Sequence, residues 1–305
     1  MKTYKYHLAK RGKWMCPKCG QKTFVCYVDD NNQVLSPEVG KCDRADKCNY
    51  HRPPRDYFKD NSIIFEFKHN RSYNRPTFKP QPKPSKVCSS DMKQTLKDYD
   101  HNHLITFFRS TFGDEVTNNV ISKYYIGTTD HWEGSTVFWQ IDRFGIIHCG
   151  KVMQYDPTTG KRIKKPNNRI TWMHRINHQE NFILSQCLFG EHLIANNDIT
   201  VAIVESEKTA MIASVFFADC IVVACGGCGN LTEKMCKALK NRDVVLLPDQ
   251  GKFADWSDKA NKLGDIFKSV TVSNIMEREA RYLGDDVGDL FLERYANGTI
   301  EELEF

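Results

Sequence analysis

The chain has 305 residues, of which 40% are hydrophobic and 27% charged, and its formal net charge is +5. That length suits two ordinary domains or one larger domain with an appended module, and the mild positive charge permits a polyanionic partner without requiring one. No apolar run approaches the ~20 residues of a membrane span. The basic start, residues 1–14, lacks the apolar core of a secretory signal, so we expect a cytoplasmic protein without membrane contact.

The first predicted element is a zinc-ribbon module over residues 1–60. The chain has 12 cysteines, and without a secretory signal these indicate thiols and metal sites rather than disulfides. Two cysteine pairs flank a predicted hairpin that turns at residues 29–33, a pattern typical of a tetrahedral zinc site with four thiolate ligands. The spacing within the second pair is long, so His51 remains an alternative ligand. The four predicted zinc ligands are Cys16, Cys19, Cys42 and Cys48.

A zinc site with four protein ligands performs no chemistry, but it supplies folding energy to a small module. We expect the module to present a rigid surface to nucleic acid, with protein docking as the alternative. Cys26, in the strand between the pairs, is expected to pack rather than to bind zinc. Residues 61–90 are predicted to be a basic, Pro-rich linker, because residues 68–86 are rich in proline, lysine and arginine and contain no acid.

Residues 91–199 are predicted to form a second, α+β region. Residues 90–113 have helical periodicity, with an apolar side that includes Leu104 and Phe108. Two strands follow, Thr136–Ile141 and Ile146–Tyr155, and the turn sequences after them indicate an antiparallel sheet.

Residues 200–305 alternate apolar strands with helices, which predicts a mostly parallel sheet covered on both faces. The active crevice of such sheets lies at the carboxyl ends of the strands, and Glu205 and Asp249 each follow a predicted strand. The CxxC in residues 225–229 has no second pair at ligand spacing, so we interpret it as a tight glycine turn. The predicted strands are residues 200–205, 220–225, 243–249 and 269–274.

Acidic residues converge on this predicted edge from three strands. Besides Glu205 and Asp249, the loop after the last strand carries Asp285, Asp286 and Asp289. Several carboxylates at one edge suit Mg²⁺ or Mn²⁺, which can also bind substrate phosphates. The sequence therefore predicts a catalytic metal site. Its predicted ligands are Glu205, Asp249, Asp286 and Asp289, and we expect Glu205 and Asp249 to be catalytic.

The motifs of this segment resemble those of the Toprim domain, the metal-binding fold shared by bacterial-type primases, type IA and II topoisomerases and some nucleases. Residues 204–210 (VESEKTA) resemble the glutamate motif, with Ser206 where glycine is usual. Residues 222–227 (VVACGG) are similar to the second strand and its glycine turn. Residues 246–251 (LLPDQG) resemble the Asp-x-Asp motif, and residues 285–289 (DDVGD) the later acidic motif.

The resemblance extends upstream of the Toprim-like segment. Residues 136–156, followed by an LFG at 188–190, are similar to the subdomain that precedes Toprim in bacterial-type primases, and a zinc ribbon before both is the primase order. The small primase-like proteins of mobile elements and phages are the most similar kind. One departure concerns Gly251, which occupies the second aspartate position of Asp-x-Asp. That metal site could be weaker, or completed by Asp255 or by the acidic loop.

A basic stretch from Lys151 to Arg175 carries one acid, Asp156. Beside a carboxylate site, such cations could hold a template strand or a triphosphate, although a solvated loop is the alternative. Trp139 and Trp172 could stack on bases, but we expect them to be core residues. The residues predicted to bind nucleic acid or nucleotide are Lys151, Lys161, Arg162, Lys164, Lys165, Arg169 and Lys208.

Together, these features predict a primase-like enzyme that synthesises short RNA primers on single-stranded DNA from ribonucleoside triphosphates. Glu205 could instead act as general base on the attacking 3′ hydroxyl. A Toprim nuclease or recombination factor is one alternative, and a non-catalytic DNA-binding protein, suggested by Gly251, is another. If the protein primes replication, we expect the helicase to be a separate polypeptide.

Overall fold

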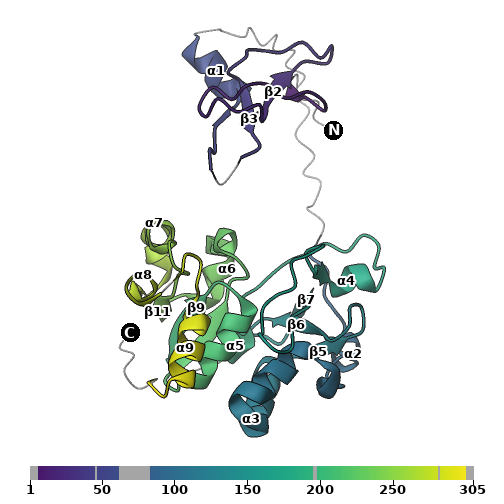
Figure 1. Ribbon diagram of the computed structural model, residues 1–305, viewed down its shortest axis with the longest axis vertical. Coiled ribbons are helices and arrows are strands. Elements are labelled where there is room, and N and C mark those ends of the chain that lie inside the picture. Colours follow the sequence, from purple (N-terminus) through teal and green to yellow (C-terminus); the bar gives the residue numbers. More distant parts are fainter. Residues whose placement is uncertain (1–5, 45–46, 62–82, 195–197, 281, 300–305) are drawn as a thin grey trace, which may run out of the picture. The chain divides into compact units, whose positions relative to one another are not determined.

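The computed structural model describes residues 6–44, 47–61, 83–194, 198–280 and 282–299. The chain divides into two compact units, Met1–Lys79 and Pro80–Phe305, which Figure 1 shows as ribbons. Most of the predicted linker over residues 61–90 lies outside the described residues. The predicted boundary at residue 200 falls inside the second unit, between two sheets.

The first unit contains a four-stranded antiparallel sheet in the order β1-β2-β3-β4, followed by one helix. Burial alternates along β2, where Phe24, Cys26 and Val28 are buried, as expected for a strand with one covered face. The turn predicted at residues 29–33 is present, because the Asp29 side chain accepts hydrogen bonds from two backbone N–H groups there. The elements are β1 (His7–Leu8), β2 (Phe24–Val28), β3 (Gly40–Cys42), β4 (His51–Arg52) and α1 (Pro54–Asp60).

The second unit begins with helices and a four-stranded antiparallel sheet in the order β5-β6-β7-β8. The antiparallel sheet predicted for this region is confirmed, and its two longest strands lie within a residue or two of the predicted positions. The strands are β5 (Gly127–Thr129), β6 (Ser135–Ile141), β7 (Ile147–Met153) and β8 (Ile170–Trp172), and the helices are α2 (Ser89–Lys93), α3 (His103–Tyr124) and α4 (Met173–Ile176).

The helix predicted over residues 90–113 is interrupted. Asp98 adopts a left-handed backbone conformation with φ 56°, and Asn102 caps a new helix by accepting a hydrogen bond from the Ile105 N–H. Asparagine and aspartate favour both roles. The new helix, α3, continues past Gly113, which has φ 79° and marks a kink, to Tyr124. The prediction was therefore wrong at both ends of this helix.

A second sheet, in the order β10-β9-β11-β12, has every pair of neighbours parallel, which confirms the predicted parallel sheet. The α8 and α9 helices, after its last strand, were not predicted. The strands are β9 (Thr200–Val204), β10 (Cys220–Ala224), β11 (Asp243–Leu246) and β12 (Ser269–Val272), and the helices are α5 (Glu207–Phe216), α6 (Glu233–Cys236), α7 (Phe253–Leu263), α8 (Ile275–Glu279) and α9 (Val287–Ala296).

Alternate residues of the parallel strands face two hydrophobic cores. Val201 and Ile203 of β9 belong to a core with residues of α6 and α7, whereas Ala202 and Val204 belong to a core with residues of α3, α5 and α9. Both faces of the sheet are therefore covered, which explains why its strands are apolar on both sides.

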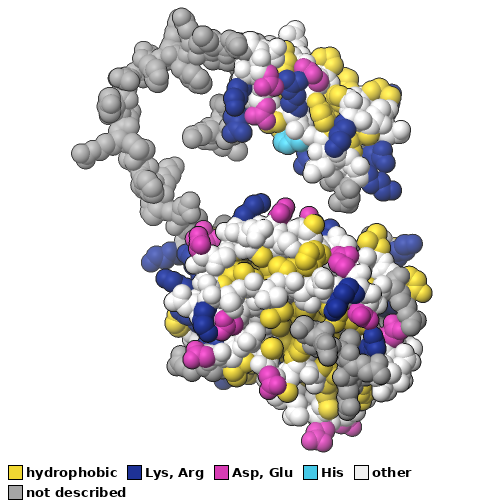
Figure 2. Space-filling model, turned by 90° about the vertical axis from the view of Figure 1, so that its left-hand side faces the viewer, with side chains coloured by type: hydrophobic (Ala, Val, Ile, Leu, Met, Phe, Trp, Pro, Cys, Tyr) yellow, Lys and Arg dark blue, Asp and Glu magenta, His cyan; other side chains and the backbone are white. Residues whose placement is uncertain are grey.

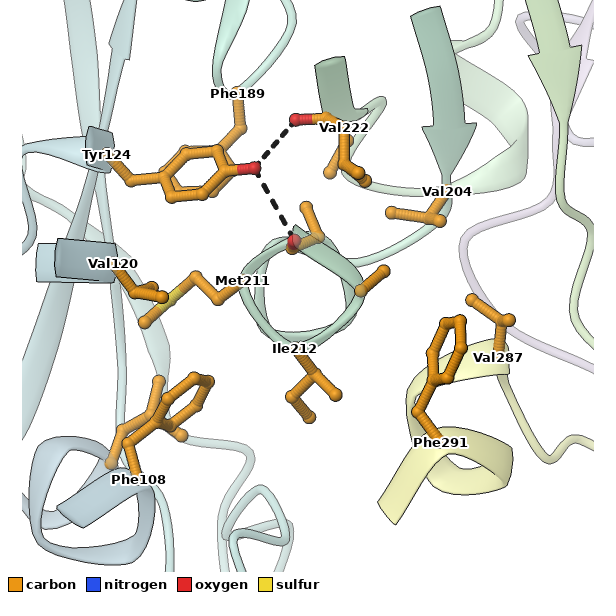
Figure 3. Close-up of a cluster of buried hydrophobic side chains, with 14 of the residues drawn as sticks. Phe108, Val120, Tyr124, Phe189, Val204, Met211, Ile212, Val222, Val287 and Phe291 are labelled. Carbon is orange, nitrogen blue, oxygen red and sulfur yellow. Dashed lines mark hydrogen bonds between the residues drawn. The ribbon is translucent and has the colours of Figure 1, made fainter. Parts of the chain in front are cut away.

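The second core joins the two sheets of this unit. Figure 3 shows α5 between residues of α3 on one side and of α9 on the other. The Tyr124 hydroxyl, at the end of α3, donates to the carbonyl oxygen of Val222 at 2.8 Å, and its ring stacks on Phe189. Phe189 in turn pairs with Ala224 at the edge of the parallel sheet. The antiparallel and parallel sheets are thus held as one unit.

The described surface gives no sign of a membrane span. Among the described helices, none combines the length and the apolar character needed to cross a bilayer.

On the face of the second unit visible in Figure 2, lysine and arginine side chains are interspersed with acidic ones, so positive charge is not concentrated there.

Candidate active site

The first candidate site is the group of four cysteines in the first unit. The Sγ atoms of Cys16, Cys19, Cys42 and Cys48 all lie within 4.8 Å of one another. Tetrahedral zinc with Zn–S bonds of about 2.3 Å places its sulfurs about 3.8 Å apart, and Cys16 and Cys48 are separated by 3.6 Å. The four thiols therefore fit a structural zinc ion.

Local hydrogen bonds favour the thiolate at two of these cysteines, whereas burial raises the pKa of the Cys48 thiol to about 12. The Gln21 backbone N–H lowers the pKa of the Cys19 thiol to about 7, and a hydrogen bond with Thr23 lowers the pKa of Cys42. A lower pKa favours the thiolate, which is the form that binds zinc.

The alternative ligand His51 lies outside this group. It is exposed on β4, and its ring stacks on Tyr27, whose hydroxyl lies 3.2 Å from its Nε2. Cys26 is fully buried on β2 and is also not among the clustered thiols. The four-cysteine set is therefore the one that the structure supports.

The second candidate site is a cleft of about 620 Å³ in the second unit. Carboxylates near the ends of the parallel strands and at the start of α9 form the part of its lining that we call the acidic or carboxylate wall. Cations of the hairpin that follows β7 form the part that we call the cationic wall, and Lys208 comes from α5. The acids that line the cleft are Glu205, Asp249, Asp286 and Asp289. The cations that line it are Lys161, Arg162, Lys164 and Lys208.

Strand ends and a helix start position the acids. Glu205 directly follows β9, and Asp249 follows β11 by three residues. Asp286 caps α9, where its Oδ1 accepts from the Asp289 N–H at 3.0 Å and Asp289 accepts from the Asp286 N–H. Thr209 of α5 donates to Asp286 at 2.6 Å. The predicted acidic loop is therefore the capped start of a helix.

Crowding of these acids shows in their electrostatics. Burial, followed by the charges of Glu205, Asp286 and Asp289, raises the pKa of Asp249 to about 8. Burial and Asp289 also raise the pKa of Asp286, although Lys208 acts in the opposite direction. The Oε2 atom of Glu205 is buried and has no hydrogen-bond partner. A cation bound among these groups would reduce the repulsion between the carboxylates and would give the unpaired oxygen a partner.

The carboxylates fit magnesium through water rather than as a closed cage. Among the described residues, only the four cysteines form a group of three or more candidate ligands with atoms within 4.8 Å of one another. Mg²⁺ usually retains several waters and takes one or two carboxylates plus substrate phosphates. The open acidic wall is compatible with that mode, and Glu205 and Asp249 are the residues that would hold the ion.

The cationic wall is a hairpin closed by backbone hydrogen bonds. Asp156 N–H donates to the Lys161 carbonyl oxygen, and Tyr155 pairs with Arg162. Arg162 has a buried Nε without a partner, so this side chain has an unused donor in the cleft wall. Lys208, from α5, lies 3.8 Å from Asp289.

Several predicted binding residues lie outside the cleft lining. Lys151 pairs with the buried Glu207 at 3.0 Å. Lys165 is exposed, and Arg169 lies over the ring of Trp132 at 5.5 Å. Of the two tryptophans predicted to be core residues, Trp139 is fully buried and its Nε1 donates to Thr95, whereas Trp172 is only half-buried on β8.

Gly251 has a structural reason to be glycine. Its φ is 79°, and a Cβ there would lie 2.8 Å from Cδ1 of Leu283. Its N–H donates to Glu277 of α8 at 2.8 Å, and the same oxygen accepts from Phe253 at 3.3 Å. Glu277 therefore holds the loop that follows Asp249 in place through hydrogen bonds. No sequence pattern indicated this role. Asp255, a predicted substitute ligand, is an exposed residue of α7 next to Lys252.

Two family models match parts of the chain. A zinc beta-ribbon finger matches residues 4–63, which include the four clustered cysteines, and a domain of unknown function, DUF6371, matches residues 102–250. Among curated proteins, none matches.

Several solved primase structures are similar to the chain. The primase fragment of the bacteriophage T7 primase-helicase protein has 15% identity and a TM-score of 0.43 over 97% of this chain and 98% of that chain. The zinc-binding and RNA polymerase domains of Aquifex aeolicus primase have 13% identity and a TM-score of 0.38 over 97% and 79%. The E. coli primase catalytic core has 12% identity and a TM-score of 0.34 over 70% and 73%. Because these values are low, the function has to be argued from the geometry of the site.

Proposed function

We propose that this protein is a primase-like nucleotidyltransferase with a Toprim domain over residues 200–305, of the kind that serves mobile elements or phages. It would join ribonucleotides into short primers on a single-stranded DNA template. The observation that supports this most is the single cleft that is lined both by carboxylates near the carboxyl ends of parallel strands and by cations of the hairpin after β7. One wall suits divalent metal and the other suits phosphate.

The reaction would take place between these walls. The 3′ hydroxyl oxygen of the growing strand attacks the α-phosphorus of a ribonucleoside triphosphate, a new P–O bond forms, and the bond to pyrophosphate breaks. Magnesium or manganese, when bound, neutralises charge on the attacking and leaving oxygens. Lys161, Arg162 and Lys164 would hold the triphosphate or the template. Glu205 would bind the metal or, as the alternative, accept the hydroxyl proton on its unpaired buried oxygen.

The zinc ribbon would contribute recognition rather than chemistry. All four of its ligand positions are cysteines, so no open position remains for a substrate. Its surface would contact nucleic acid, and protein docking remains the alternative.

One observation favours a second candidate, a DNA-binding protein without catalysis. Gly251 stands at the second aspartate position, and the acids do not form a close group. A nuclease using the same acids would differ in the attacking nucleophile, which would be water.

The deciding experiment uses the full chain with single-stranded DNA and Mg²⁺ or Mn²⁺. Primer synthesis is followed with ribonucleoside triphosphates, and cleavage is followed with the same labelled strand without them. We expect primers from the wild type and a loss of about a hundredfold in Glu205→Gln and Asp249→Asn. Asp258→Asn, an exposed acid of α7, is the matched control and should retain activity. Cleavage without synthesis would indicate the nuclease, and neither activity at any metal concentration would indicate the non-catalytic protein.

A further inference from the structure

A buried ion pair joins β7 of the antiparallel sheet to the start of α5 in the parallel half of the unit. Lys151 lies on β7 of the antiparallel sheet, and Glu207 is the first residue of α5, which follows β9 of the parallel sheet. The Lys151 Nζ donates to both carboxylate oxygens of Glu207 at 3.0 Å. The Glu207 side chain is 1% exposed and that of Lys151 is 12% exposed. The two charges are therefore paired with each other and largely shielded from solvent.

The pair is enclosed by the turn after β10. A Cβ on Gly226 would lie 3.3 Å from Oε1 of Glu207 and 3.9 Å from Nζ of Lys151, and Gly226 has φ 74°. Glycine is the residue that adopts this conformation without strain and leaves room for the carboxylate. The sequence analysis predicted this glycine turn but gave it no role. In the structure the turn lies against the ion pair.

Each partner leads directly to one wall of the cleft. Glu207 lies two residues after Glu205, and the next residue, Lys208, lines the cleft. Lys151 lies on the strand that continues into Tyr155 and the cationic hairpin. The Lys151–Glu207 ion pair therefore connects the antiparallel sheet with the parallel half of the unit.

We propose that Lys151 and Glu207 are positioning residues that fix the cationic hairpin at its distance from the carboxylate wall, and that Lys151 does not itself contact phosphate. The proposal rests on the proposed function only in assuming that both walls bind one nucleotide. A bidentate pair restricts both distance and direction, and removing one partner leaves an uncompensated buried charge.

The first test separates positioning from phosphate contact. Single-strand DNA binding by the full chain is measured against salt concentration without divalent metal. Each phosphate contact to a single strand contributes about 0.7 to the slope of log K against log salt. We expect Lys151→Met to keep the wild-type slope, whereas Lys161→Met, the matched control in the cleft, should lower it by about 0.7. An equal fall in Lys151→Met would overturn the proposal.

The second test measures both walls together without chemistry. A fluorescent ATP analogue is titrated at saturating Mg²⁺, and we expect its Kd to rise about tenfold or more in Lys151→Met and in Glu207→Gln, because small displacements of binding groups are costly. Lys151→Arg, which keeps the charge, should recover most of the affinity. Unchanged Kd values in both single variants would overturn the proposal.

A double variant covers the case in which the single variants fail to fold. Lys151→Met with Glu207→Leu removes both buried charges, and apolar replacements of buried pairs are often neutral for stability. We expect it to fold, to keep the DNA salt slope and to bind the ATP analogue weakly. Wild-type affinity for the analogue in this variant would mean that the pair only fills space. If the wild type binds no analogue, the proposed function fails, and the DNA salt slope still decides whether Lys151 contacts phosphate.

Discussion

The zinc cluster and the cleft are assembled in opposite ways. The four cysteines come from one short module, where hydrogen bonds lower the pKa of Cys19 and Cys42 and burial raises the pKa of Cys48 to about 12. The acids of the cleft come from the ends of β9 and β11 and the start of α9, and burial, followed by the charges of Glu205, Asp286 and Asp289, raises the pKa of Asp249 to about 8. The first site is thus formed within one small module, whereas the second forms only when separate strands and helices pack together.

This difference predicts where stability comes from. The first unit has a core built mainly around the four cysteines and Phe24, so metal binding should supply much of its folding free energy. The second unit has two large apolar cores, so its fold should not depend on the metal in the cleft.

The largest effect should follow loss of a zinc ligand. We expect Cys19→Ser to lose zinc and to unfold the first unit, because structural zinc contributes roughly 10 kcal/mol in small zinc modules. Zinc content is measured by metal analysis, and folding of residues 6–61 by limited proteolysis. Cys26→Ser, a buried cysteine outside the cluster, is the control and should keep its zinc. Wild-type protein without zinc, purified without chelators, would contradict the four-cysteine site.

The next effect concerns the cationic wall. Replacing Lys161, Arg162 and Lys164 together with glutamine should weaken single-strand DNA binding and reduce its salt slope by about 2, at about 0.7 for each phosphate contact. Lys165→Gln serves as control, because Lys165 is exposed and does not line the cleft. Equal slopes in the triple variant and the wild type would reduce the hairpin to a solvated loop.

Features of the fold and the sites that depend on residues close together in the sequence could be predicted. Contacts between segments far apart in the sequence were harder to predict. The cysteine pairs, the antiparallel sheet and the parallel sheet were predicted from local spacing and periodicity. The structure confirms these predictions. The convergence of Glu205 and Asp249 could be predicted because parallel strands carry their ends to one edge. The sequence did not show that Lys151 would pair with Glu207, because two different sheets have to pack before the two charges meet.

The interrupted helix shows a second limit. Periodicity indicated one helix over residues 90–113, but the capping side chain of Asn102 and the left-handed Asp98 set the actual boundaries. The same applies to Glu277 of α8, whose side chain accepts from the loop residue Gly251 and from Phe253 at the start of α7. Patterns of apolar residues do not encode such side-chain to backbone contacts.

A smaller effect is expected from the pH dependence of stability. The pKa of Asp249 is about 8 in the folded protein and about 3.9 in an unfolded chain. Between these values the folded state binds a proton that the unfolded state does not, so the second unit should lose stability as pH rises from about 4 to about 8. Thermal melting without divalent metal should show this decline. Asp249→Asn should flatten it, while Asp258→Asn should not. A decline that is identical in wild type and Asp249→Asn would place its origin elsewhere.

The smallest effect, and the sharpest test of the open site, concerns Gly251. An aspartate there would restore the second acid of the Asp-x-Asp motif, but any side chain must adopt φ 79° and displace the exposed Leu283. Left-handed conformation costs roughly 1–2 kcal/mol, so the matched control is Gly251→Asn, which has the same shape and strain without the charge. We expect both variants to melt slightly below the wild type. If the cleft lacks one ligand, Gly251→Asp should need several-fold less Mg²⁺ for half-maximal primer synthesis than Gly251→Asn. Equal requirements would mean that the carboxylates already present hold the metal through water, and that glycine is retained for the loop that Glu277 pins.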